Sequence, residues 1–204
     1  MLNGITGSGK TEVYLQLAQQ CLVNHQQVLI LVPEIGLTPQ TIERFKRRLP
    51  YPVRTIHSGL NETEQMAMWS LSSRAIPQVV IATRSGLFVP LPKLGLIIVD
   101  EEHDGSYKQS SGWRYSARDL AIVRAKQANV PILLGSATPS LETRHLLDSG
   151  QYHELLLTRR PTQQQQPTYE LLDIRKLPLD QGLSLPLIDR VRSALSRGDP
   201  VGWT

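Results

Sequence analysis

The sequence predicts an α/β fold in which a mainly parallel sheet is covered by helices on both faces. Continuous apolar runs such as residues 28–32 (VLILV) and 94–99 (LGLIIV) are typical of strands buried on both sides. These runs alternate with segments whose apolar residues recur every three or four positions, as in amphipathic helices. Alternating strands and helices indicate a parallel sheet, whose ligands bind at the carboxyl ends of its strands.

The individual elements follow from apolar patterns and helix-start signals. Residues 1–3 are expected to be the end of a strand, and the helix after residue 11 repeats apolar residues at Val13, Leu17 and Cys21. Thr38 before Pro39 and the box formed by Ser116 and Asp119 are typical helix starts. Further strands are expected at residues 28–32, 53–56, 78–82, 94–99, 132–134 and 152–157. Further helices are expected at residues 38–49, 62–71, 116–128, 140–147 and 187–196.

The chain divides into three predicted parts at a change of composition. We expect one lobe at residues 1–158, a linker rich in proline and glutamine at 159–186, and a truncated C-terminal appendage at 187–204 that begins a second lobe. Only three residues stand before Gly4, where a full strand is expected. We therefore expect the sequence to be a piece of a longer protein.

Charge and cysteine content restrict the protein class. The formal net charge is +4, a mild basic excess that suits a polyanionic partner without establishing one. Cys21 is the only cysteine, so a disulfide within the chain and a cysteine-rich zinc site are both excluded. No segment resembles a membrane span or a signal peptide. The expectation is a cytoplasmic protein without a membrane partner.

Residues 4–11 read GITGSGKT and satisfy the phosphate-loop pattern G-x-x-x-x-G-K-[ST]. The glycines allow backbone N–H groups to surround phosphate oxygens, and the following helix directs its positive end at them. Lys10 is expected to neutralise the β- and γ-phosphates, and Thr11 to ligate Mg²⁺. A chance glycine turn is the alternative, but the amphipathic helix behind the loop argues against it. The predicted nucleotide-binding residues are Gly4, Ile5, Thr6, Gly7, Ser8, Gly9, Lys10, Thr11 and Glu12.

An acidic turn closes the apolar strand at residues 94–99. We expect Asp100 to hold Mg²⁺, since this metal prefers oxygen ligands, and Glu101 to orient and deprotonate the attacking water. A solvated acidic loop is the alternative, which the buried strand before it disfavours. His103 is either a surface histidine or a sensor of nucleotide state. Lys10, Asp100, Glu101 and His103 form the predicted catalytic set.

Two motifs, DEEH at residues 100–103 and GSATPS at 135–140, resemble the DExH-type helicases of superfamily 2. The segments that narrow this resemblance to the replication-restart helicases are VPEIGLTPQ (32–40), HSGLN (57–61), ATRSGLF (82–88) and residues 100–121. The resemblance extends from about residue 2 to residue 160.

The resemblance implies a RecA-like P-loop NTPase lobe of an ATP-driven 3′-to-5′ DNA helicase that binds stalled forks and D-loops. It further implies ATP and Mg²⁺ as cofactors, partnership with other primosome proteins and single-stranded DNA-binding protein, and a bacterial, nucleoid-associated location. In the family, the segments matching residues 32–40, 57–59 and 83–85 face DNA, and the one matching 135–138 couples hydrolysis to unwinding. The predicted residues for DNA contact or coupling are Arg84, Tyr107, Lys108, Trp113, Arg114, Ser136 and Thr138.

Residues 107–115 resemble the family's aromatic-rich loop. Tyr107, Trp113 and Tyr115 fall within nine positions of a chain that is only 5% aromatic, and such rings stack on unpaired bases. The alternative is that Trp113 and Tyr115 pack beneath the following helix. We expect at least one of the three to contact or sense DNA. The basic cluster Arg44, Lys46, Arg47 and Arg48 is expected to be a solvated helix face.

Parts of the resembled proteins are missing from this sequence: a preceding DNA-binding region, most of the second lobe with its arginine-bearing motif, and the zinc-binding cysteines. Zinc is therefore not expected. An arginine finger contributes ~10³–10⁵ in rate in related enzymes, so we expect this chain to bind nucleotide, to hydrolyse it poorly and not to unwind DNA. The alternatives are an inert nucleic-acid-binding module and the motor lobe of an RNA helicase or restriction-type translocase. A phosphate-loop kinase is disfavoured, because it would have no use for the GSATPS segment.

Overall fold

The computed structural model describes residues 1–159, 173–175, 177–180 and 182–196. The chain separates into two compact units, residues 1–163 and 164–204. Much of the expected linker, and residues 197–204 of the expected appendage, lie outside the described residues. The predicted division at residues 158 and 186 therefore stays a prediction.

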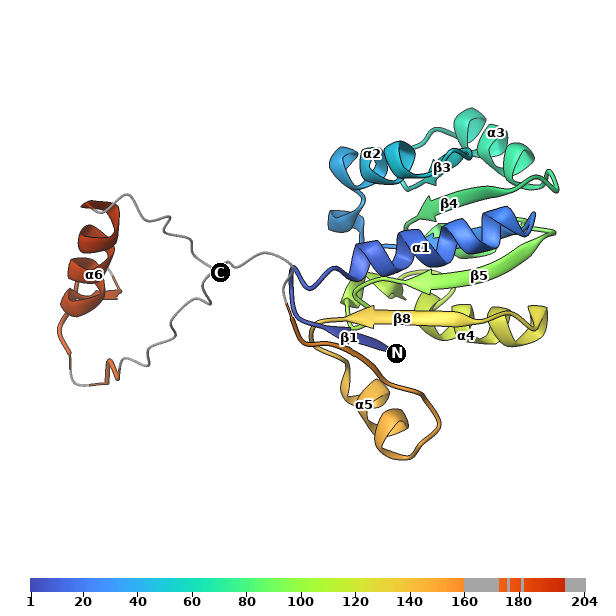
Figure 1. The fold of residues 1–204 in the computed structure, drawn as a ribbon. Helices are drawn as coiled ribbons and strands as arrows, with labels where there is room; N and C mark the ends of the chain where they lie inside the picture. The colour runs from blue at the N-terminus through green and yellow to red at the C-terminus, as the bar shows by residue number, and fades with distance from the viewer. Residues whose placement is uncertain (160–172, 176, 181, 197–204) are drawn as a thin grey trace. The chain divides into compact units, whose positions relative to one another are not determined.

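The first unit contains a seven-stranded parallel sheet, which confirms the predicted fold class. Its strands appear as parallel arrows in Figure 1, several of them labelled there. In spatial order they are β3 (Val53–Ile56), β4 (Gln78–Ala82), β2 (Gln27–Leu31), β5 (Leu94–Val99), β8 (Ile132–Ser136), β1 (Leu2–Gly4) and β9 (Leu155–Leu157). The order places β8 between β5 and β1, so the segments that follow these three strands leave the same edge of the sheet.

Helices cover both faces of this sheet. On one face lie α1 (Lys10–Val23) and α2 (Pro39–Arg48), and on the other α4 (Ala117–Ala128), with α3 (Glu62–Ser72) and α5 (Leu141–Asp148) completing the unit (Figure 1). The sequence of strand β2 is continuously apolar because both faces of the strand are buried. Val28 and Ile30 pack with the α1 side, whereas Leu29 and Leu31 pack with the α4 side, and all four are fully or almost fully buried.

Side-chain caps begin most of these helices. Thr38 accepts a hydrogen bond from the Thr41 N–H at the start of α2, and Ser116 accepts one from the Asp119 N–H at the start of α4. Asn61 and Glu64 form a reciprocal capping box at α3. Helix α1 differs, because no side chain caps its first turn among the described residues.

The predicted and observed boundaries differ at a few places. Strand β8 continues two residues beyond residue 134, and β9 begins three residues after residue 152. Tyr152 instead packs against the core cluster on the α4 side. The pair β6 (Lys108–Gln109) and β7 (Tyr115–Ser116) was not expected, because two-residue strands are too short for an alternating pattern.

The second unit holds one described hairpin and one helix. Strands β10 (Leu179–Asp180) and β11 (Leu183–Ser184) pair antiparallel across Gly182, whose φ of +87° favours glycine. Helix α6 (Leu185–Ser196) covers the helix expected at residues 187–196 and begins two residues earlier. In the described part of the chain, no helix combines the length and apolar character that a membrane crossing needs.

Candidate nucleotide-binding site

The glycine loop and the acidic turn meet at the carboxyl edge of the sheet. The loop follows β1 and the turn follows β5, with only β8 between them. As a result Lys10 Nζ lies 3.4 Å from Glu101 Oε1, although ninety-one positions separate the two residues. Thr11 and Asp100 line the same cavity as this pair. The two segments therefore lie close together, as expected from the sequence, whereas their binding of one nucleotide stays a prediction.

The cavity has a volume of about 880 Å³, which lies within the usual range for small-molecule sites. Of the predicted nucleotide-binding residues, those from Thr6 to Glu12 line it, whereas Gly4 and Ile5 do not. Gly4 instead helps to hold Lys10, because its carbonyl accepts a hydrogen bond of 2.9 Å from Lys10 Nζ.

The loop itself has the geometry that a phosphate group requires. Gly7 and Gly9 have φ angles of +78° and +95°, which a residue with a side chain rarely adopts. Gly9 is the N-cap of α1 and leaves the first-turn N–H donors without a side-chain acceptor among the described residues. The buried Ser8 hydroxyl also has no partner in that part of the chain. Together with Lys10, these donors fit a triphosphate.

Asp100 is held by bonds from two elements. The Tyr14 hydroxyl and the Glu101 N–H donate to Asp100 Oδ1 over 2.8 and 3.1 Å, and the Tyr107 hydroxyl donates to the Asp100 carbonyl over 2.6 Å. Burial raises the pKa of the Asp100 carboxyl, while the bond from Tyr14 acts in the opposite direction. Divalent metal binding supplies the opposite charge that favours the ionised form.

A magnesium ion bound here together with a nucleotide would need few protein ligands, because Mg²⁺ keeps several waters and binds phosphate oxygens. Thr11 and Asp100 supply the hydroxyl and carboxylate oxygens that fit it. No cluster of three or more His, Cys, Asp or Glu side chains is placed to hold a metal within the described residues. The expectation that zinc is absent stays a prediction.

Glu101 adopts a backbone conformation that is unusual for a residue with a side chain. Its φ is +44°, and such left-handed residues cost about 1–3 kcal/mol and persist only where the surrounding structure imposes them. The turn places the Glu101 carboxylate between Lys10, at 3.4 Å, and His103 Nδ1, at 3.7 Å, with 35% of the side chain exposed. A partly exposed carboxylate at the cavity wall can accept a proton from water.

His103 connects the acidic turn to the segment at residues 135–138. Its Nδ1 lies 2.7 Å from Ser136 Oγ, and its Nε2 lies 3.3 Å from Thr138 Oγ1. Three of the predicted site residues are therefore in contact, although they come from the ends of two different strands. This arrangement can relay a change at the turn to the GSAT segment. Its role in sensing nucleotide stays a prediction.

Glu102 was assigned no role from the sequence, yet it is the most highly connected acid of the turn. It is 2% exposed, and its carboxylate accepts hydrogen bonds from the Ser140 N–H at 2.8 Å, Thr143 Oγ1 at 2.9 Å and Arg118 Nη1 at 3.0 Å. Glu102 thus joins the turn to the starts of α4 and α5. In the sequence, only the position of Glu102 within DEEH indicated a role for it, because its hydrogen-bond partners lie 16 to 41 residues away.

Tyr107, one of the three aromatic residues that could stack on bases, is buried in the structure. Tyr107 is 1% exposed, and its hydroxyl is bonded to the Asp100 carbonyl. The ring packs in the core on the α4 side, because its apolar body is buried while its hydroxyl still finds an acceptor. A coupling role between the aromatic loop and the acidic turn is compatible with this position; direct stacking is not.

The rest of the aromatic loop forms the β6–β7 hairpin. Trp113 is 92% exposed, and Lys108 and Arg114 are also exposed. Tyr115 instead makes an edge-to-face contact with Phe88, with ring centroids 5.4 Å apart. The alternative of core packing therefore applies in part to Tyr115 but not to Trp113.

Arg84 supports this hairpin from the neighbouring segment. Its Nη1 donates to the carbonyls of Ser106 and Lys108 at 3.0 and 3.1 Å. Of the two roles predicted for Arg84, coupling therefore fits its observed bonds better than direct DNA contact.

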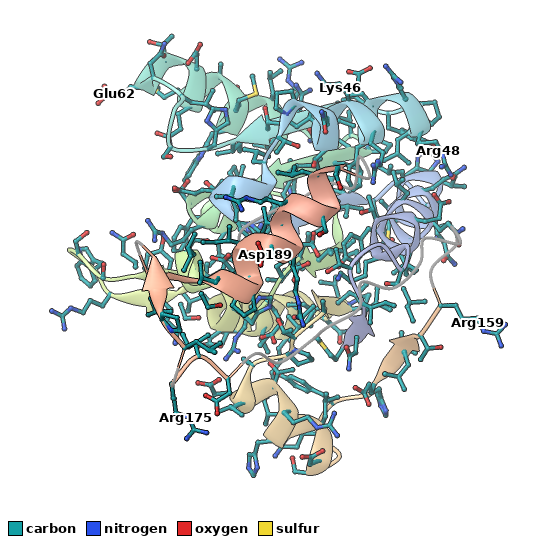
Figure 2. The ribbon with its side chains drawn as sticks, turned by 90° about the vertical axis from the view of Figure 1, so that its left-hand side faces the viewer. Lys46, Arg48, Glu62, Arg159, Arg175 and Asp189 are labelled. Atoms are coloured by element: carbon teal, nitrogen blue, oxygen red, sulfur yellow. The ribbon has the colours of Figure 1, made fainter. Side chains whose placement is uncertain are left out.

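The basic residues of α2 are exposed, as expected, but three of them also border the nucleotide cavity. Arg44, Arg47 and Arg48 line it, whereas Lys46 does not. Arg48 makes two hydrogen bonds of 2.8 and 2.9 Å with Glu12, where the end of α2 approaches α1 (Figure 2). The sequence did not reveal this, because the pairing spans 36 residues.

Comparison with known proteins agrees with this site. The sequence is 46% identical to replication restart protein PriA of Haemophilus influenzae over 98% of this chain and 28% of that protein. It is 40% identical to the PriA of Bacillus subtilis over 98% of this chain and 25% of that protein. The chain thus spans about a quarter of the length of these relatives. The matches confirm the resemblance drawn from the sequence motifs.

The fold is similar to helicase domains of known structure. The Pyrococcus furiosus Hef helicase domain matches with a TM-score of 0.57 and 23% identity, covering 77% of this chain and 34% of that one. RecG bound to a three-way DNA junction matches with a TM-score of 0.57 and 23% identity, covering 80% and 21%. The family model for DEAD/DEAH box helicases matches residues 1–147. The chain therefore belongs to the DEAD/DEAH box helicase family.

Proposed function

We propose that this chain is the ATP-binding motor lobe of a 3′-to-5′ DNA helicase that acts in primosome assembly and in the restart of stalled replication forks. The observation that carries the proposal is the meeting of Lys10 and Glu101, 3.4 Å apart, in one cavity with Thr11 and Asp100. The identity of 40–46% to replication restart proteins over nearly the whole chain supports the biological setting.

We propose a task for the polar residues that converge on the cavity and for His103 beside them. Lys10 and the loop N–H groups bind the β- and γ-phosphate oxygens. Thr11 and Asp100 would hold Mg²⁺, which when bound supplies further neutralisation of phosphate charge. Glu101 orients the attacking water and accepts its proton. His103 passes the state of the cavity to Ser136 and Thr138 through the two contacts described above.

DNA is the proposed macromolecular partner. Trp113 offers an exposed ring for stacking, and Lys108 and Arg114 offer cations to the phosphates. Other primosome proteins and single-stranded DNA-binding protein are proposed partners of the whole protein, which would act in the bacterial cytoplasm at the nucleoid. We also propose the domain division at residues 1–158, 159–186 and 187–204, with full hydrolysis and unwinding requiring a complete second lobe.

Binding of a fluorescent ATP analogue tests the proposal. Lys10→Ala is expected to lower the affinity roughly tenfold or more, the effect of losing a charged hydrogen bond worth about 1.5–3 kcal/mol. Lys46→Ala is the matched control, because Lys46 lies on α2 but does not line the cavity. Absence of magnesium-dependent binding in the unmodified chain would overturn the proposal. Equal binding of single-stranded RNA and DNA would instead favour the motor lobe of an RNA helicase.

A further inference from the structure

One buried hydroxyl that contacts Asp100 has no part in the chemistry proposed above. Tyr14 lies in the second turn of α1, is 2% exposed and donates to Asp100 Oδ1 over 2.8 Å. The ring packs in the core cluster on the α1 side, where a phenylalanine would fill the same volume. The hydroxyl is therefore the part of this side chain that the core does not require.

A glycine on the neighbouring strand makes room for this hydroxyl. Leu134 of β8 lies opposite Val99 of β5, so Gly135 lies beside Asp100. A Cβ built on Gly135 would overlap the Tyr14 hydroxyl and lie 3.4 Å from Asp100 Oδ1. The Gly135 backbone is not left-handed, so any residue could adopt its conformation. Glycine is needed here for space and not for backbone freedom.

The bonds to Asp100 are distributed unevenly over its two oxygens. Tyr14 and the Glu101 N–H both donate to Oδ1, and no hydrogen bond from the described residues reaches Oδ2. A carboxylate whose one oxygen is fixed by a buried hydroxyl has a restricted orientation. Its other oxygen is then available for a metal ion or for a water bound to the metal.

We infer that Tyr14 is a positioning residue for the metal ligand Asp100 and that Gly135 is the space that admits it. The inference rests on the proposed function, since it requires that Asp100 binds Mg²⁺. Tyr14 of the phosphate-loop helix and Gly135 of β8, the strand that leads into the GSAT segment, thus both lie at one oxygen of Asp100 in the acidic turn.

Titration of Mg²⁺ against binding of a fluorescent ATP analogue tests the inference on the full 204-residue chain. Tyr14→Phe is expected to raise the Mg²⁺ concentration for half-maximal binding about tenfold, since removal of an outer partner of a metal ligand commonly costs 10- to 100-fold in metal affinity. Binding of the analogue in EDTA is expected to change less than about twofold. A hydroxyl that serves folding alone would lower stability without moving the Mg²⁺ midpoint.

The matched control is Tyr51→Phe, because Tyr51 packs against the same core cluster but is not one of the two donors to the Asp100 carboxylate within the described residues. Its Mg²⁺ midpoint is expected to equal that of the unmodified chain. Gly135→Ala provides a second route, since the added methyl would displace the Tyr14 hydroxyl from Asp100 without removing it from the chain. This variant is expected to raise the Mg²⁺ midpoint in the same direction.

The outcomes separate this inference from the proposed function. No Mg²⁺-dependent binding by the unmodified chain refutes the proposed function and with it the inference. Normal Mg²⁺ dependence of the unmodified chain, with unchanged midpoints in both Tyr14→Phe and Gly135→Ala, overturns the inference alone. Equal loss of binding with and without Mg²⁺ in Tyr14→Phe also overturns it, because the hydroxyl would then support the phosphate loop instead of the metal ligand.

Discussion

At the acidic turn beside the nucleotide cavity, carboxylates are fixed by partners from distant elements, whereas in the β6–β7 hairpin the side chains of Lys108, Trp113 and Arg114 are exposed to solvent. Asp100 and Glu102 each accept bonds from residues far along the chain, and Glu102 is 2% exposed. Trp113 of the hairpin is 92% exposed. Chemistry requires atoms held in place before the substrate arrives, while a strand of nucleic acid can be met by side chains that adjust to it.

The two regions are nevertheless joined. Tyr107 stands at the start of the hairpin and donates to the Asp100 carbonyl, and Arg84 donates to the carbonyls on either side of Tyr107. A displacement of the hairpin therefore acts directly on the backbone that carries the proposed metal ligand. The contrast predicts that substitutions in the cavity change rate or folding strongly, while substitutions in the hairpin change DNA affinity moderately and leave the fold intact.

The largest effect is expected for Glu101→Gln. Removing the proposed proton acceptor should lower residual ATP turnover about 10²- to 10⁴-fold, while affinity for the ATP analogue changes less than about threefold. A coupled phosphate-release assay measures the rate. Glu62→Gln is the control, since Glu62 is an exposed acid in the first turn of α3 and does not line the cavity. An unchanged rate would remove Glu101 from the role of base.

Glu102→Ala is expected to have the next largest effect, on stability. The change leaves the Arg118 guanidinium, whose side chain is 16% exposed, without its buried partner, and this costs about 3–5 kcal/mol in free energy of unfolding. Urea denaturation measures the loss. Asp119→Ala is a closely matched control, because Asp119 pairs with the same arginine but is 56% exposed, and exposed pairs contribute about 0–1 kcal/mol. Equal losses for the two variants would contradict the buried network.

The contrast between Glu101 and Glu102 also shows which residues of a site can be predicted from a sequence. Lys10, Thr11, Asp100 and Glu101 were identified because each lies in a short contiguous pattern, and the strands behind them are apolar enough to be recognised. The parallel order of strands then brings the patterns together. Most of the fold and the centre of the site were predictable for this reason.

The supporting bonds were not predictable, because each depends on residues far apart in the sequence. Tyr14 has the spacing of an ordinary core residue in a helix, and its acceptor stands 86 positions later. Tyr107 has the sequence context of a stacking residue but is buried. Whether an aromatic ring faces solvent or the core depends on the hairpin that carries it, and the two strands of this hairpin are two residues long.

A moderate effect is expected for Trp113→Ala. Stacking of one base on an aromatic ring contributes about 1–3 kcal/mol, so affinity for single-stranded DNA should fall about 5- to 150-fold, with urea stability unchanged. Fluorescence anisotropy of a labelled oligonucleotide measures the affinity. Met66→Ala is the control, because Met66 is 74% exposed on α3, outside the hairpin. An unaltered affinity would show that the exposed ring does not carry DNA binding.

The smallest effect is expected for Lys108→Ala, and it is best seen in the salt dependence of binding. A lysine that contacts one phosphate adds about 0.7 to the slope of log affinity against log salt for a single strand, since its binding releases condensed counterions. Removing Lys108 should lower the slope by about this amount, with only a few-fold loss of affinity at low salt. Lys46→Ala removes another exposed charge, from α2, and should leave the slope unchanged if the hairpin alone carries the contact. Equal reductions for both lysines would mean that DNA binding depends on the overall charge of the lobe. The hairpin would then not be a specific DNA contact, and the functional contrast between cavity and hairpin would be contradicted.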